Sequence, residues 1–132
     1  MNKMFKWFFG NARKPHGFIG TCILKFMNSY GHEWLAEWVF DFIEICNGDS
    51  LLDIGCGGGG NISRLLQKYP HSSVYGVDYS PTSVALSKKI NVKEIKNNRC
   101  RVILGDAQNI PFESNSLNVV TAFETIYYWQ DI

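Results

Sequence analysis

The chain has 132 residues, of which 45% are hydrophobic and 19% are charged; this composition supports one buried core and is too apolar for a disordered chain. The formal net charge of +1 at pH 7 is too small for a protein that binds nucleic acid mainly through its charge. The four cysteines form no CxxC pair, so we predict a reducing, cytoplasmic environment and no metal site.

Residues 1–28 form a basic, aromatic N-terminal arm. All five Lys and Arg residues among the first 32 precede the first acid, Glu33, and aromatic residues occupy positions 5, 7, 8 and 9. Such an arm either packs on its own domain, covers a substrate pocket or lies on an anionic membrane surface. The apolar run at 17–27 contains Lys25 and is about half of the roughly 20 residues that a membrane span requires. Residues 29–132 are predicted to form the main domain.

A helical pattern follows the arm. Apolar residues recur at helical spacing between residues 29 and 45, and Asn47 with Gly48 would end the helix. We expect an amphipathic helix with a wide apolar stripe made of Trp34, Leu35, Trp38, Val39, Phe42 and Ile43.

From residue 51 onwards, short apolar runs alternate with helical patterns. Strands are predicted at 51–54, 73–78, 101–104 and 117–123. One helix would begin at an Asn61 cap and end before Pro70, and another would begin at Ser80 and Pro81 and run to about Lys96. This alternation predicts an α/β fold of βαβ units, a Rossmann-like three-layer sandwich with a mostly parallel sheet, preceded by N-terminal helices.

Five of the twelve glycines lie at 55–60, between the first predicted strand and its helix. Gly55, Gly57 and Gly60 match GxGxxG, a spacing that lets a ligand approach the backbone at a helix N-terminus. The alternative is a tight turn without a ligand, but it would not require so many glycines, each of which adds an entropic cost to folding.

Acidic residues stand at the ends of three predicted strands. Asp53 stands just before the glycines. At a distance of 5 Å and an effective dielectric constant of about 20, it would repel one negative charge of a pyrophosphate by about 3 kcal/mol. It would instead favour an ammonium or sulfonium group. Asp78 can accept hydrogen bonds from both hydroxyls of a ribose, and Asp106 can accept from the amine of adenine. Alternatively, Asp53 accepts loop N–H groups and Asp78 begins the turn into Ser80.

These motifs resemble the class I S-adenosylmethionine-dependent methyltransferases, of the small-molecule type that includes ubiquinone and menaquinone biosynthesis enzymes. LLDIGCGGGG at 51–60 is similar to the family's first motif, VYGVDYS at 74–80 to its ribose acid, and GDAQNIPFESNSLNVV at 105–120 to its adenine loop and fourth strand. The resemblance implies the strand order 3-2-1-4 for the part present. Members usually continue past the fourth strand, so we expect this chain to lack the C-terminal part of the domain.

The resemblance also implies a cofactor and the residues that bind it. The cofactor is S-adenosylmethionine, with S-adenosylhomocysteine as the product. Asp53 would lie near its amino group, and Asp78 would hold its ribose hydroxyls. The remaining residues would contact the methionine and ribose (Gly55, Gly57 and Gly59), the adenine ring (Tyr79) and the adenine amine (Asp106 and Ala107).

The implied function is methyl transfer to a small-molecule acceptor, without a nucleic-acid partner. One alternative is a non-catalytic module that binds S-adenosylmethionine or S-adenosylhomocysteine, and another is a nicotinamide-dependent oxidoreductase, which Asp53 and Asp106 disfavour. No residue is assigned as catalytic; the candidates for a general base are Glu124, Tyr127, Tyr128 and His32. The aromatic residues at 127–129 favour an apolar or planar acceptor.

The last predicted strand, 117–123, carries no charge and no proline. In the sheet order that the resemblance implies, it forms an edge of the sheet. Edges of this kind template pairing with another chain, so we expect either self-association through this strand or a longer protein of which another part covers it.

Overall fold

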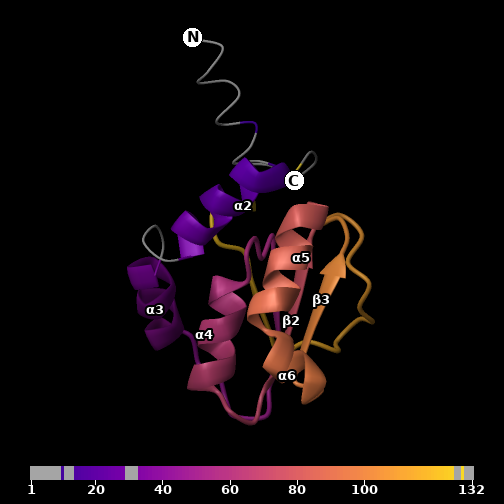
Figure 1. Ribbon diagram of the computed structural model, residues 1–132. Coiled ribbons are helices and arrows are strands. Elements are labelled where there is room, and N and C mark those ends of the chain that lie inside the picture. Colours follow the sequence, from indigo (N-terminus) through magenta and orange to yellow (C-terminus); the bar gives the residue numbers. More distant parts are fainter. Residues whose placement is uncertain (1–9, 11–13, 29–32, 127–128, 130–132) are drawn as a thin grey trace.

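The computed structural model describes residues 10, 14–28, 33–126 and 129. Strands alternate with helices from residue 50 to residue 104, as predicted, and a loop joins the third strand to the fourth (Figure 1). The elements are α2 (Gly17–Phe26), α3 (Glu33–Phe42), β1 (Ser50–Ile54), α4 (Gly60–Lys68), β2 (Ser73–Asp78), α5 (Pro81–Ile90), α6 (Val92–Lys96), β3 (Cys100–Leu104) and β4 (Val119–Thr121).

The four strands form one parallel sheet in the order β3-β2-β1-β4, which confirms the predicted Rossmann-like fold class and strand order. In this register Asp53 of β1 lies opposite Gly76 of β2 and Thr121 of β4. Asp78, the last residue of β2, lies opposite Leu104 of β3. The strands' carboxyl ends therefore meet at one edge of the sheet, where ligands of open parallel sheets bind.

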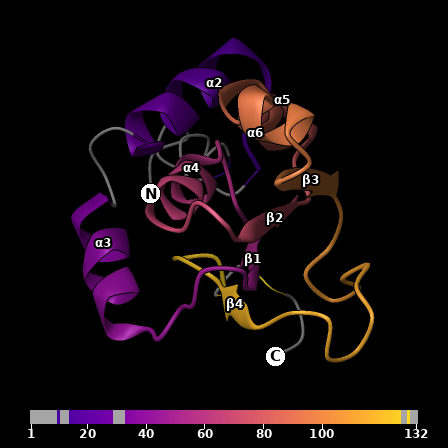
Figure 2. The same cartoon turned by 90° about the horizontal axis from the view of Figure 1, so that it is seen from below.

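The two faces of the sheet are covered differently (Figure 2). One core cluster joins the sheet to α3 and α4, with Phe40, Leu51 and Ile62 among its most buried residues. The opposite face carries Leu52, Ile54 and Val77, and loop side chains pack on it: Ile110, Phe112 and Leu117. Within the described part of the chain, helices cover only one face, and the 105–118 segment covers the other.

The apolar stripe predicted for the first long helix is only partly correct: Leu35, Val39 and Ile43 are half-buried, but the deepest residues lie beside them. α3 buries Ala36 and Phe40, while Lys68 of α4 pairs with Glu37 and Asp41. Burial of Ala36 and Phe40 sets the rotation of the helix about its axis, and the exposed acids that pair with Lys68 add little to it. The large aromatic residues of the predicted stripe consequently lie exposed: Trp34, Trp38 and Phe42.

Three other boundaries differ from the prediction. α4 begins at Gly60, with Gly59 rather than Asn61 as its N-cap. The predicted helix at 80–96 is divided into α5 and α6 at Asn91, whose side-chain amide donates to the carbonyls of Ser87 (3.0 Å) and Gly59 (3.2 Å). β4 spans only 119–121 of the predicted 117–123. The predicted Ser80 cap with proline at the first helical position is confirmed.

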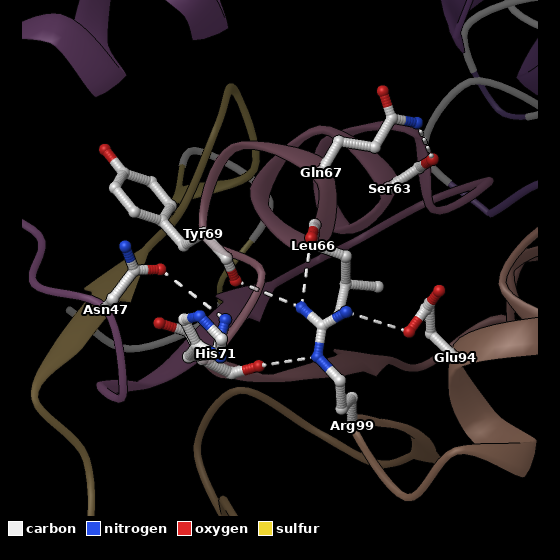
Figure 3. A network of polar contacts seen from close by, with 9 residues as sticks. Asn47, Ser63, Leu66, Gln67, Tyr69, His71, Glu94 and Arg99 are labelled. Carbon is white, nitrogen blue, oxygen red and sulfur yellow. Dashed lines mark hydrogen bonds and ion pairs between the residues drawn. The ribbon is translucent and has the colours of Figure 1, made fainter.

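Arg99 organises the sheet edge opposite the carboxyl ends of the strands (Figure 3). Its guanidinium donates to the carbonyls of Leu66 and Tyr69, both at 3.0 Å, and of Ser72 at 3.3 Å. It also pairs with Glu94 at 2.9 Å. Arg99 therefore satisfies carbonyls at the end of α4, which have no partner within the helix, and fixes the connection from α4 to β2.

The described residues contain neither a membrane-spanning helix nor a metal-binding cluster. None of their helices has the length and apolarity that crossing a membrane requires. No group of three or more His, Cys, Asp or Glu side chains within the described ranges could hold a metal ion.

Candidate functional site

A cavity of about 270 Å³ lies at the carboxyl ends of the strands, where the glycine turn, α2 and the segment after β4 meet. Its lining combines carboxylates with apolar and aromatic side chains. Of the eight residues that sequence analysis predicted to bind a cofactor, the cavity wall contains seven: Asp53, Gly55, Gly57, Asp78, Tyr79, Asp106 and Ala107.

The glycine turn keeps part of this cavity open. Gly55 and Gly57 have φ angles of +71° and +52°, in the left-handed region that favours glycine. A Cβ atom on Gly55 would come within 2.4 Å of the Thr125 side chain, so Gly55 permits close packing. A Cβ atom on Gly57 would have Leu24 at 3.6 Å as its neighbour, so this glycine borders open space.

Gly59 does not line the cavity. Its φ angle is +82°, and a Cβ atom there would lie 2.3 Å from Oγ of Ser87 on α5. Its carbonyl accepts a hydrogen bond from Asn91. The structure therefore places Gly59 at the junction of α4 with α5, where it permits close packing, rather than facing a ligand as the resemblance implied.

Asp53 is a buried carboxylate, only 2% exposed. Among the described residues its side chain bonds to Thr121, whose hydroxyl donates to Oδ1 at 2.8 Å, rather than to a loop N–H group. Burial raises the pKa of Asp53 from 3.8 to about 7; the Thr121 bond acts in the opposite direction and the nearby charge of Asp78 adds to the increase. A positive ligand charge beside Asp53 would favour its ionised form.

Asp78 joins the glycine turn to the start of α5. Its Oδ2 accepts from the N–H of Gly57 at 2.9 Å, and its Oδ1 accepts from the N–H of Ser80 at 2.8 Å. Burial raises the pKa of Asp78, and these two bonds partly offset the increase. The Ser80 bond is the turn contact that sequence analysis left open as an alternative. A carboxylate has about four acceptor positions, so Asp78 keeps acceptor capacity for a ligand in the cavity.

The remaining predicted residues lie on the β2 and β3 side of the cavity. Tyr79 follows β2, and the ammonium of Lys14 lies 5.2 Å from its ring centroid. Asp106 follows β3 and accepts from the N–H of Gln108 at 3.0 Å, so its carboxylate is oriented by its own turn. Ala107, next to it, is half-buried.

Sequence analysis missed the wall that the N-terminal segment contributes. Pro15, Leu24, Met27 and Asn28 all line the cavity. The Ser80 hydroxyl donates to the Pro15 carbonyl at 2.6 Å, and the Asn28 amide donates to the carbonyl of Gly58 at 3.1 Å. The described part of the arm thus packs on its own domain. Its aromatic residues at 5, 7, 8 and 9 lie outside the described residues.

The segment after β4 also contributes to the cavity wall. Phe123, Glu124, Thr125 and Trp129 line the cavity. Glu124 has a φ angle of +52°, a backbone conformation that is uncommon for residues other than glycine. Of the four predicted general-base candidates, Glu124 alone belongs to the described residues; Tyr127, Tyr128 and His32 lie outside them. Arg64 of α4 also lines the cavity, although the sequence offered no reason to distinguish it from other basic helix residues.

Comparison with known proteins gives one family match. The profile of the family described as "Methyltransferase domain" matches residues 52–132. An uncharacterized methyltransferase of Schizosaccharomyces pombe is 34% identical over 89 residues, which cover 63% of this chain and 32% of that protein. The 24-methylenesterol C-methyltransferase 2 of Arabidopsis thaliana is 28% identical over 88 residues, covering 67% of this chain and 24% of the relative.

A solved structure shares the fold. The geranyl diphosphate C-methyltransferase from Streptomyces coelicolor A3(2), in complex with Mg²⁺, geranyl diphosphate and S-adenosylhomocysteine, superposes with a TM-score of 0.64. It is 18% identical, and the match covers 83% of this chain and 41% of that one. The S. pombe and A. thaliana relatives are longer than this chain, which spans 32% and 24% of their lengths.

Proposed function

Since the chain belongs to the class I S-adenosylmethionine-dependent methyltransferases, we propose that it binds S-adenosylmethionine in the cavity and transfers a methyl group to a small-molecule acceptor. One observation carries this proposal. Three carboxylates, Asp53, Asp78 and Asp106, lie at or next to the carboxyl ends of three adjacent parallel strands and line one cavity with an open glycine turn.

The chemistry of these donors fits the proposed cofactor. Asp53 is buried and acidic, and a cationic ammonium would lower its pKa by favouring the ionised form. Asp78 retains acceptor positions for ribose hydroxyls, and Asp106 can accept from an exocyclic amine. A dinucleotide would instead bring two phosphate charges toward these carboxylates, which disfavours the nicotinamide-dependent alternative.

S-adenosylmethionine supplies a methyl group on a positively charged sulfur, which an acceptor atom displaces in line. The protein's contribution is therefore to position the two reactants and to exclude water. The apolar wall for this purpose consists of Leu24 of α2, Met27 at the C-cap of α2, and Phe123 and Trp129 of the C-terminal segment. Glu124 is the described group that could accept a proton from the acceptor, where the acceptor has one to lose.

The acceptor is proposed to be an apolar or planar small molecule. The apolar wall supports this class, and two of the similar proteins are named as methyltransferases of a sterol and of geranyl diphosphate. The proposed compartment is the cytoplasm, because all four cysteines, two of them exposed, are free thiols.

Calorimetry tests the cofactor assignment. We expect the chain to bind S-adenosylhomocysteine and not NAD. Asp78→Ala should weaken binding about 10- to 100-fold, because hydrogen bonds to a charged group contribute roughly 1.5–3 kcal/mol. Asp41→Ala removes a carboxylate from the exposed surface of α3 and should leave affinity unchanged. Equal affinity in the Asp78→Ala variant and the parent would overturn the ribose assignment.

Catalysis requires a separate experiment. Transfer of a labelled methyl group is measured with a panel of quinols, sterols, prenyl diphosphates and nucleotides. Transfer to an apolar member supports the proposed function. Binding of the cofactor without transfer to any member would instead make this chain a cofactor-binding module.

A further inference from the structure

Arg64 places a mostly buried positive charge in the wall of the cavity. Its side chain is 16% exposed and lies on the first turns of α4, beside Gly60 and Asn61, which line the same cavity. Three of the cavity's carboxylates lie at the strand ends, and a fourth, Glu124, follows β4, whereas this cation comes from the helix. The cavity is therefore polarised, with negative groups over the sheet and a positive group at α4.

Neutral groups hold the guanidinium in place. Nη2 donates to the backbone carbonyl of Asn28 at 2.9 Å, and Nη1 donates to Oδ1 of Asn61 at 3.1 Å. The Asn28 side chain donates in turn to the carbonyl of Gly58. Arg64 is thus fixed relative to both α2 and the glycine turn, so its position does not depend on a flexible surface contact.

The charge of Arg64 has only a weak counterion among the described residues. Glu33 lies 3.7 Å from Nη2, beyond hydrogen-bond distance, and its side chain is 62% exposed. An exposed pair of this length contributes little, while a buried charge without a close counterion is costly. A guanidinium has five N–H donors, and the two hydrogen bonds above use two of them. Arg64 can therefore still bind an anion.

The start of α4 also favours an anion near Arg64. Gly59 is the N-cap and provides no side-chain hydrogen bond to the first turn. The N–H groups of that turn and the positive end of the helix dipole attract negative charge. Arg64 and the helix terminus act in the same direction, and Gly58, Gly60 and Asn61 bring this part of the helix to the cavity.

We propose that Arg64 binds the carboxylate of the cofactor's amino-acid group. This inference rests on the proposed function, because it assumes a ligand that carries both an ammonium and a carboxylate. The polarity of the cavity orients such a zwitterion, with its ammonium toward Asp53 and its carboxylate toward Arg64. Arg64 then makes the site specific for a nucleoside that carries an amino-acid carboxylate.

The test compares two ligands that differ in the carboxylate alone. S-adenosylhomocysteine has it, and S-adenosyl-3-thiopropylamine keeps the nucleoside, thioether and ammonium without it. Calorimetry on the full chain should show that the parent prefers S-adenosylhomocysteine about 10- to 100-fold. Arg64→Met should abolish that preference while changing the affinity for the amine by less than about twofold, and Arg64→Lys should restore part of it.

Two controls separate binding from folding. Lys68→Met removes a cation from the same helix, where it pairs with Asp41, and should leave both affinities unchanged. Thermal unfolding shows whether the loss of the Asn28 and Asn61 bonds disrupts the domain. If Arg64→Met weakens both ligands equally, or neither, Arg64 does not bind the carboxylate. If the parent binds neither ligand, the proposed function itself fails.

Discussion

Neutralising Asp53 should stabilise the folded chain at neutral and alkaline pH and have little effect in acid. The carboxyl group is 2% exposed, and burial raises its pKa from 3.8 to about 7. Asn has the same shape as Asp and can still accept a hydrogen bond from the Thr121 hydroxyl, which donates to Oδ1 in the parent. Asp53→Asn therefore removes the charge and preserves the contact.

The sign and size of the effect follow from the two pKa values. Between about pH 4 and pH 7, the folded chain retains a proton on Asp53 that the unfolded chain has released, so stability falls as the pH rises through this window. At 1.36 kcal/mol per pH unit, the interval corresponds to about 4 kcal/mol. This is an upper limit for burial of Asp53 alone, because the charge of the neighbouring Asp78 contributes to the raised pKa.

Urea denaturation of the parent and of Asp53→Asn between pH 4 and pH 8.5 measures this difference. We expect the two stabilities to coincide near pH 4 and to diverge by up to about 4 kcal/mol at pH 8. Asp106→Asn, which removes an exposed carboxylate from the same cavity, serves as the control. Stability curves of Asp53→Asn and the parent that run parallel over the whole range would refute the assignment of a buried, neutralised Asp53.

Three further predictions concern other parts of the fold. Gly57→Val should stay folded and lose S-adenosylhomocysteine binding in calorimetry, whereas Gly17→Val, at a similar φ of +63° outside the cavity, should retain it. Arg99→Met should destabilise the domain by about 1–3 kcal/mol in urea denaturation without changing ligand affinity, and Glu94→Gln by less, because it leaves the three carbonyl bonds intact. Val120→Lys, on an exposed position of the edge strand β4, should abolish any self-association seen by light scattering; an equally associated variant would place that contact elsewhere.

The strands of the sheet and the edge where their carboxyl ends meet could be predicted from the sequence, because the patterns that indicate them are local. β2 occupies the predicted residues 73–78, and Ser80 with Pro81 begins the next helix as expected. Each signal depends on a few adjacent residues: an apolar run, a turn residue or a cap. The strand order came instead from the family resemblance, and the register agrees with it.

The rotation of α3 and the role of Gly59 could not be predicted, because both depend on contacts distant in the sequence. α3 faces the domain through Phe40, which is buried and packs against Phe123, 83 residues later. Gly59 bonds to Asn91, 32 residues later. The proposal that Arg64 binds a carboxylate likewise depends on its burial and on its neutral hydrogen-bond partners, which the sequence does not reveal. Sequence periodicity assigns such a residue to the solvated face of a helix.

The buried charge of Asp53 links the stability of the fold to ligand binding. Without a positive charge beside it, an ionised Asp53 destabilises the folded chain, and burial therefore holds its pKa near 7. A bound cationic group stabilises the ionised form of Asp53. Because the ionised fraction of Asp53 rises with pH, part of the binding free energy should also vary with pH. Affinity for S-adenosylhomocysteine should consequently increase as the pH rises through 7 in the parent and stay nearly constant in Asp53→Asn. Asp53 thus favours a cationic ligand because its ionised form is unfavourable without one.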